Sequence, residues 1–246
     1  MASTLIRAFR GAMSFMTVLP LGGEVNEISL YFLPLSGAVV GLVAWLGFRL
    51  FALAGSPLLA AAVAIGVDAW VTRGLHYDAL ADTVDGLGGF LERQRRLQVM
   101  DEPTVGAFGV LAIVIAVALR ISALGAVGFP LYLIGFFVVS RTAMVLILTT
   151  VPLAKERSIA RIFGSLSRKG VIVAMVAYLA ASITVIAWLG DLLAVPVAAL
   201  GLAAAYLVTR RASRLIGGVT GDVVGAAGLV CETVMLLAWT LARLHG

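Results

Sequence analysis

Seven stretches of almost uninterrupted apolar residues cover most of this 246-residue sequence, and they constrain its fold more than any other feature. A helix needs about 20 mostly apolar residues to cross the hydrocarbon core of a bilayer. Because 61% of the residues are hydrophobic and only 13% are charged, a soluble globule could not cover the apolar surface. We therefore predict an all-α fold, a polytopic bundle of about seven transmembrane helices, forming one membrane-embedded domain over residues 1–246. The stretches are Ser29–Ala54, Pro57–Val71, Ala107–Val127, Leu131–Leu153, Val171–Leu189, Leu192–Val208 and roughly Val223–Ala242.

The segment before the first stretch predicts a helix that lies on the membrane surface instead of crossing it. Arg7 and Arg10 stand beside Phe9, Phe15 and Met16, and this mixture of basic and large apolar residues is typical of interfacial amphipathic helices. A cleaved signal peptide is not expected, because Arg10 interrupts the apolar part and no clear small-residue cleavage site follows.

The basic residues gather in segments that would lie on one side of such a bundle. Basic residues are enriched in cytoplasmic loops, so we predict a multi-pass protein of the inner (cytoplasmic) membrane with its N-terminus inside and its C-terminus outside. The net charge of +5 then reflects contact with anionic lipid, and no nucleic-acid partner is expected. The three turns expected outside carry one charge, Asp191. Fourteen of the 18 Lys and Arg residues lie on the inner side: Arg7, Arg10, Arg73, Arg93, Arg95, Arg96, Lys155, Arg157, Arg161, Arg168, Lys169, Arg210, Arg211 and Arg214.

Three carboxylates at helical spacing follow the second apolar stretch. Asp78, Asp82 and Asp85 stand at positions i, i+4 and i+7, which places them within about 60° on one helix face. Carboxylates so close repel one another unless a cation lies among them, and hard oxygen ligands suit Mg²⁺ or Mn²⁺. Gly86 comes next and would let a bulky phosphate approach the backbone. We interpret the three as metal ligands, with a solvated acidic helix face as the alternative.

Two neighbouring features leave more than one interpretation open. His76 lies about 160° from Asp78 around the helix, so a hydrogen bond or a substrate contact is favoured over metal ligation. Asp101 and Glu102 form a second acidic pair, which either folds over the metal or caps the start of the next helix. The sequence does not decide between these two roles.

Three further features predict the binding of an anion. Arg141 lies in the middle of an apolar stretch, where an unpaired charge is costly, so it either contacts substrate or pairs with an acid such as Glu232. Arg157 and Arg161 belong to a basic loop, whose charge suits phosphate but also follows from its cytoplasmic side. Asp222 lies in a glycine-rich turn before the last stretch, where glycines either cradle a phosphate or allow close helix packing.

These motifs resemble those of a known enzyme family. The run His76-Tyr-Asp78-Ala-Leu-Ala-Asp82-Thr-Val-Asp85-Gly86 is similar to the signature L-H-x-D-G-L-A-D-T-x-D-G of the cobalamin (5′-phosphate) synthases, also called adenosylcobinamide-GDP ribazoletransferases. Ala79 replaces the usual glycine, and Met100–Thr104 stands where the family has M-[KR]-D-[SP]-[RH], so this loop's substrate contacts differ from the family pattern. Further matching segments follow in the family's order over essentially the whole chain: Phe15–Pro20, Tyr31–Gly37, Val105–Val110, Ser140–Ala143 and Gly217–Gly225.

The resemblance implies a Mg²⁺-dependent transferase of cobalamin (vitamin B12) biosynthesis. Such an enzyme joins adenosylcobinamide-GDP to α-ribazole, or to its 5′-phosphate, and releases GMP. Membrane lipid, a homo-oligomer and other enzymes of nucleotide-loop assembly are the further partners compatible with it. Together with the residue analysis, it gives Asp82 and Asp85 as catalytic residues, Asp78, Asp82 and Asp85 as metal ligands, and His76, Gly86, Arg141, Arg157, Arg161 and Asp222 as substrate-binding residues.

Two other classes share part of this pattern. CDP-alcohol phosphotransferases contain D-x-x-D-G, as at Asp82–Gly86, but this sequence lacks their A-R after the glycine and their later D-x-x-x-D. An ion-coupled transporter would also use intramembrane carboxylates. We find no internal inverted repeat, and the acids cluster at the predicted cytoplasmic edge, so an enzyme is favoured.

Overall fold

The computed structural model describes residues 2–155, 167–189 and 192–245, and helices joined by turns and short loops make up these ranges. Apart from the helices, the described residues contain one isolated β-bridge, between Leu153 and Val219. Two short 3₁₀ helices, η1 (Glu27–Phe32) and η2 (Leu131–Leu133), precede longer ones. The α-helices are α1 (Ala2–Met16), α2 (Leu33–Ala52), α3 (Pro57–Val71), α4 (Leu75–Gly88), α5 (Arg93–Val99), α6 (Ala107–Val127), α7 (Ile134–Thr150), α8 (Arg168–Trp188), α9 (Ala194–Ile216) and α10 (Gly221–His245).

The membrane spans agree with the sequence prediction. Within the described ranges, six helical segments are long and apolar enough to cross a bilayer: η1–α2, α6, η2–α7, α8, α9 and α10. The pair α3 and α4 passes the same test only when taken together, which gives up to seven spans. The all-α, polytopic fold class is therefore confirmed.

The second apolar stretch contains a feature that hydropathy did not predict. The helix ends at Val71 and the chain breaks at Arg73 and Gly74, whose φ angles are 55° and 68°. This left-handed conformation is costly for a residue with a side chain, and here it ends one helix and starts another. The two helices meet at 85°, so α4 leaves the direction of α3 and carries its carboxylates along α10 instead.

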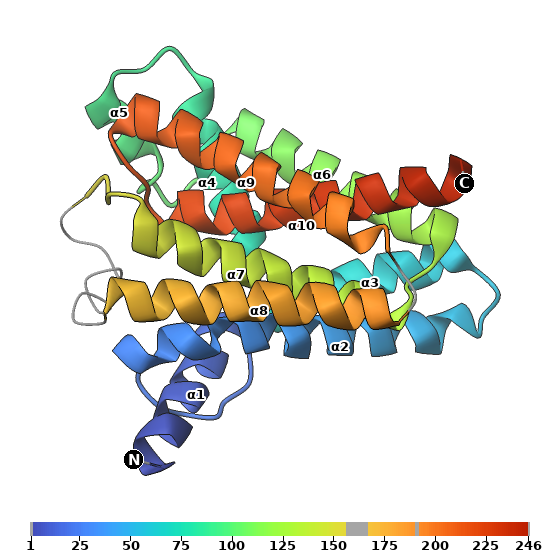
Figure 1. Cartoon of the computed structure of the whole chain (residues 1–246). Helices are drawn as coiled ribbons and strands as arrows, with labels where there is room; N and C mark the ends of the chain where they lie inside the picture. Colours follow the sequence, from blue (N-terminus) through green and yellow to red (C-terminus); the bar gives the residue numbers. More distant parts are fainter. Residues whose placement is uncertain (1, 156–166, 190–191, 246) are drawn as a thin grey trace.

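Helix α10 lies at the centre of the bundle, where it packs against α9, α4, α7 and α6 (Figure 1). It is the most enclosed of the spans, whereas α6 and α8 leave most of their apolar surface for lipid. Small residues allow the close packing: a Cβ added at Gly225 would lie 2.7 Å from the Ala79 Cβ on α4, and one at Gly228 would meet the Met144 side chain. Gly225, the last glycine of the 217–225 turn, and Gly228 thus serve helix packing.

The segments rich in basic residues lie at one end of the bundle. Figure 1 shows α1, α5, the start of α8 and the α9–α10 turn together at that end. Helix α1 lies beside the bundle there, with Ala8, Ala12 and Met13 buried, as expected for an amphipathic segment. Arg73 fastens it by donating hydrogen bonds to the backbone oxygens of Ser14 (2.9 Å) and Phe15 (3.0 Å).

Candidate active site

Three carboxylates come together where α4 packs against α10, and we call Asp78, Asp82 and Asp222 the acidic face. The close Ala79–Gly225 contact brings the two helices together, so that Asp222 lies beside the α4 carboxylates. Asp82 is repelled by the charges of Asp78 and Asp222. Within the described ranges, no member of the acidic face forms an ion pair. This unbalanced charge at the basic end of the bundle suits a cation or a proton as its partner.

Asp85 belongs to the same helix face but binds the protein itself. Its carboxylate accepts hydrogen bonds from the backbone N–H groups of Gly106 (2.7 Å) and Gly109 (2.9 Å), at the start of α6. A carboxylate at this position satisfies free donors and complements the helix dipole. Asp85 therefore caps α6 from another helix.

This cap corrects one of the two roles considered for the second acidic pair. Asp101 and Glu102 do not cap α6, because the helix begins at Ala107 and Asp85 already binds its first N–H groups. Asp101 instead pairs with Lys155 at 2.5 Å, and Glu102 pairs with Arg95 at 2.8 Å. These pairs hold the loop near Asp82, on which Asp101 acts electrostatically. Closure of the loop over a metal stays a prediction.

Asp78, Asp82 and Asp85, the predicted metal ligands, do not form a complete metal-binding site by themselves. Among the described residues, no three His, Cys, Asp or Glu side chains are arranged to hold a metal ion. Asp85 faces the start of α6, whereas Asp78 and Asp82 share the acidic face with Asp222. Asp78 and Asp82 thus offer carboxylate oxygens, which Mg²⁺ prefers. Two carboxylates suit a Mg²⁺ ion that is bound jointly with substrate phosphates. Metal binding by these residues stays a prediction.

Gly86 is required by packing in this structure. A Cβ at Gly86 would lie 2.6 Å from the Met100 side chain and 3.1 Å from the Arg96 backbone oxygen. Arg96 in turn donates to the backbone oxygens of Gly86 (3.1 Å) and Gly89 (2.7 Å). The glycine therefore lets α5 close over the end of α4, and its predicted contact with phosphate is not tested by this geometry. Arg157 and Arg161, the basic loop residues predicted to bind substrate, lie outside the described residues.

Deeper in the bundle lie four charged residues that we call the buried charge cluster: Asp68, Arg120, Arg141 and Glu232. Arg120 donates to Asp68 (3.0 Å) and to Glu232 (2.9 Å), and Arg141 pairs with the other oxygen of Glu232. The side chains of all four are no more than 3% exposed. Two cations balance two anions, which is how charges are accommodated within a bilayer.

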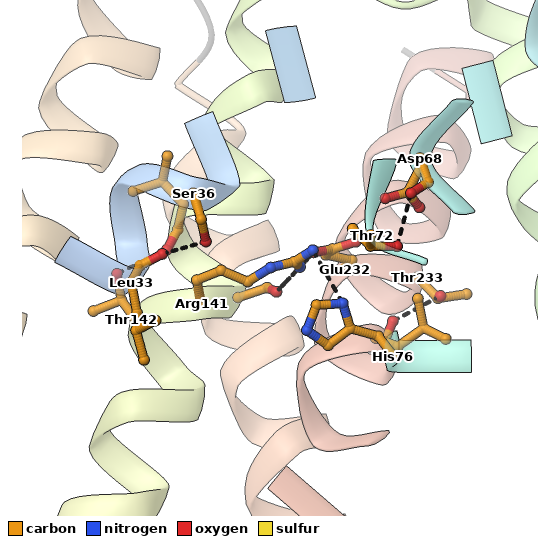
Figure 2. Close-up of polar contacts among 12 residues, drawn as sticks. Leu33, Ser36, Asp68, Thr72, His76, Arg141, Thr142, Glu232 and Thr233 are labelled. Atoms are coloured by element: carbon orange, nitrogen blue, oxygen red, sulfur yellow. Dashed lines mark hydrogen bonds and ion pairs between the residues drawn. The ribbon is translucent and has the colours of Figure 1, made fainter. Parts of the chain in front are cut away.

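Arg141 thus forms the pair with Glu232 that the sequence had left as an alternative to substrate binding. Figure 2 shows its side chain reaching from α7 toward Glu232 on α10 and His76 on α4. Its guanidinium also lies 2.8 Å from the Ser140 hydroxyl and 3.3 Å from the His76 Nδ1 atom. A role of Arg141 in substrate binding stays a prediction. Because its guanidinium contacts Glu232, Ser140 and His76, it would act on substrate through these residues.

Asp68 and Arg120 are not among the site residues that the sequence motifs predict. Both are ionisable residues within apolar stretches, and this alone marks a residue as functional or structurally paired. Asp68 also accepts a hydrogen bond from the Tyr77 hydroxyl (3.0 Å), which ties α3 to α4 across the break. The signal was therefore present, but the sequence could not show which charges meet.

A cavity of about 160 Å³ adjoins the acidic face and lies between α1, α2, α4, α7 and α10. Its walls are mostly apolar, with side chains from α1, α2, α7 and α10. Asp78 and Asp222 also line it, and His76 lies on its α4 side. A mostly apolar cavity with a few converging polar groups is the usual form of a small-molecule site.

Fold and site together define a polytopic helical membrane protein with a carboxylate-lined pocket at the basic end of its bundle. Comparison with known proteins gives the family. Residues 8–240 match the family described as Cobalamin-5-phosphate synthase, so the chain belongs to that family. No solved structure matches it.

Three relatives named adenosylcobinamide-GDP ribazoletransferase illustrate the similarity. The protein of Allorhizobium ampelinum is 36% identical, with 94% of this chain and 95% of the relative covered. That of Bradyrhizobium diazoefficiens is 33% identical over 95% and 93%. That of Syntrophobacter fumaroxidans is 36% identical over 94% and 96%. The family match confirms the predicted resemblance and argues against the phosphotransferase and transporter alternatives.

Proposed function

We propose that this chain joins adenosylcobinamide-GDP to α-ribazole, or to α-ribazole 5′-phosphate, and releases GMP. The observation that carries the proposal is the acidic face, which lies beside a small-molecule cavity in a member of the Cobalamin-5-phosphate synthase family. The relatives' printed name supplies the substrates. In this reaction a ribose hydroxyl of the ribazole attacks the phosphorus next to the corrinoid, and the phosphoanhydride bond to GMP breaks.

The chain's own residues contribute positioning and proton transfer. A carboxylate within reach of the attacking hydroxyl accepts its proton, and we assign this role to Asp82. Asp82 is half-buried among other carboxylates, and taking up a proton relieves their repulsion. Asp85 supports the site by holding the start of α6 against α4. GMP leaves as an anion, for which we propose Arg157 and Arg161 as binding residues.

We propose Mg²⁺ as the cofactor. Asp78 and Asp82 would hold it, because Mg²⁺ is usually bound by one or two carboxylates together with water and substrate phosphates. When bound, it would supply positive charge for the oxygens of the pyrophosphate. The acidic face fits this role because its carboxylates have no ion-pair partner within the described residues.

We also propose that the site opens to the cytoplasm from the inner membrane. The basic segments of the chain gather at the end of the bundle that carries the acidic face, and such segments are retained on the cytoplasmic side. Single cysteines introduced at Arg95 and Arg168 should be labelled by an impermeant reagent only from the cytoplasm. The native Cys231 is fully buried, so its background labelling should be low. Labelling from outside at either position would overturn this topology.

The activity is tested with purified protein in lipid nanodiscs. Adenosylcobinamide-GDP, α-ribazole and Mg²⁺ are added, and GMP and the corrinoid product are followed by chromatography. We expect both products in equal amounts, and none when the metal is chelated. GMP release that does not require α-ribazole would contradict a transferase, because it would indicate hydrolysis. Absence of both products with folded wild-type protein would refute the proposal.

A further inference from the structure

The cavity beside the acidic face has the size of a small aromatic ligand. A cavity of about 150 Å³ lined by apolar side chains is large enough to bind benzene, and this one measures about 160 Å³. Phe15, Leu33, Met144 and Leu148 are among its apolar walls. A corrin ring is several times too large for such a space. The cavity therefore suits one or two fused rings.

His76 presents a polar group on the wall of this cavity. Arg141 has only donors, so the His76 Nδ1 atom, 3.3 Å from its guanidinium, must be the acceptor. The imidazole proton then lies on Nε2. Among the described residues, this Nε2 atom is buried and has no hydrogen-bond partner.

The imidazole ring of His76 packs against α10 at the wall of the cavity. The Cδ2 atom, which is bonded to Nε2, lies 3.7 Å from where a Cβ of Gly225 would be, and Gly225 lines the cavity. His76 as a whole is 2% exposed. Buried donors are almost always paired in folded proteins, so this N–H group at the cavity wall is available to an acceptor on a ligand.

We propose that this cavity is the subsite for the base of the ribazole, and that the His76 Nε2–H donates a hydrogen bond to the base. This inference rests on the proposed function. A ribazole base is a benzimidazole, in which one ring nitrogen is bonded to ribose and the other carries a free lone pair. The fused rings match the apolar walls and the lone pair matches the donor. Since Asp78 and Asp222 line the same cavity, the ribose would lie beside the acidic face, where its hydroxyl reacts.

Arg141 acts as a positioning residue in this arrangement. Its guanidinium is fixed by Glu232 and Ser140, and it points a donor at the His76 Nδ1 atom. The buried charge cluster thereby selects the imidazole tautomer that offers a donor to the cavity. The partner of a histidine nitrogen commonly sets the role of the other nitrogen in this way.

The test compares α-ribazole with an analogue in which the free ring nitrogen is replaced by C–H. Wild-type protein should use α-ribazole with about tenfold higher kcat/KM, which is the scale of one hydrogen bond. His76→Leu should lose this preference, and His76→Gln, which keeps an amide donor near the Nε2 position, should retain part of it. Thr83→Val is the matched control, because Thr83 Oγ1 is also buried on α4 without a partner in the described structure but lines another cavity. Its preference should not change.

A further variant, at an apolar residue of the cavity wall, tests the cavity without changing a polar group. Val145→Phe narrows it and should weaken equilibrium binding of radiolabelled α-ribazole about tenfold or more, with unchanged binding of adenosylcobinamide-GDP. A preference that persists in folded His76→Leu, or α-ribazole binding that is unaffected by Val145→Phe, would overturn the subsite. Binding is measured without turnover, so loss of α-ribazole binding in Val145→Phe supports the subsite even if the wild type proves inactive and the proposed function fails.

Discussion

The buried charge cluster and the acidic face both include a residue of α10, yet their charges are arranged in opposite ways. In the cluster, Arg120 and Arg141 balance two carboxylates, and every member is paired and almost fully buried. On the acidic face, carboxylates from α4 and α10 repel one another and form no ion pair within the described chain. The difference indicates that the ion pairs of the buried charge cluster hold the helices together, whereas the unpaired carboxylates of the acidic face are available to bind a ligand.

Helix α4 connects the two regions. Its first turn carries Tyr77, which donates to Asp68 in the cluster, and His76, which contacts Arg141. The same helix carries Asp78 and Asp82, two of the three carboxylates of the acidic face. The break at Arg73 and Gly74 turns this helix, so that His76 and Tyr77 reach the cluster while Asp78 and Asp82 lie beside α10.

The largest effect is expected from breaking the cluster. Glu232→Ala leaves two buried guanidinium groups without their shared partner, and breaking a buried ion pair from one side costs about 3–5 kcal/mol. We expect strong loss of folded protein, measured by yield after size-exclusion chromatography and by the thermal midpoint. Asp78→Ala is the control, because Asp78 is exposed and unpaired in the described structure. Normal folding of Glu232→Ala would show that the cluster is not structural.

A smaller loss of stability should follow removal of the Asp85 cap. Asp85→Ala frees the N–H groups of Gly106 and Gly109 and should cost about 1–2 kcal/mol, the upper range for a lost helix cap. Asp85→Asn keeps one acceptor oxygen and should lose less. The measurement is thermal unfolding in detergent. If both variants melt like wild type but lose all Mg²⁺-dependent activity, Asp85 is a metal ligand and not a cap.

The smallest effect concerns the link between the two regions. Arg141→Lys keeps the charge opposite Glu232 but loses the planar guanidinium that reaches Ser140 and His76 together. We expect normal yield and about tenfold lower kcat/KM, equivalent to roughly one hydrogen bond. If activity survives this change while Arg141→Ala reduces folded protein as Glu232→Ala does, then Arg141 serves the fold alone.

The spans could be predicted because hydropathy is a local property of the sequence. The same holds for the shared helix face of Asp78 and Asp82, which follows from their spacing. The pairing of buried charges could not, since Arg120 meets partners 52 residues before it and 112 residues after it. Such contacts depend on how helices pack, and spacing within one helix carries no information about them.

The role of Asp85 shows the same limit within the candidate site. Its spacing placed it correctly beside Asp78 and Asp82, but its partners lie on α6, 21 and 24 residues further along the chain. The 85° break before α4 involves two positive φ angles, hydrogen bonds from Arg73 to α1 and packing of α4 against α10, which no periodicity reveals. The sequence therefore predicts where the acidic residues lie. The structure shows that Asp85 binds the backbone of α6, whereas Asp78 and Asp82 form no ion pair within the described residues.

The central claim is that the acidic face carries the chemistry and contributes little to the fold, and Asp82→Asn tests it most directly. Turnover of adenosylcobinamide-GDP and α-ribazole is measured with equal amounts of folded protein, together with the thermal midpoint. We predict at least about 100-fold lower turnover, the scale of a lost general base, with an unchanged midpoint. Near-normal Mg²⁺-dependent turnover in folded Asp82→Asn would contradict the account.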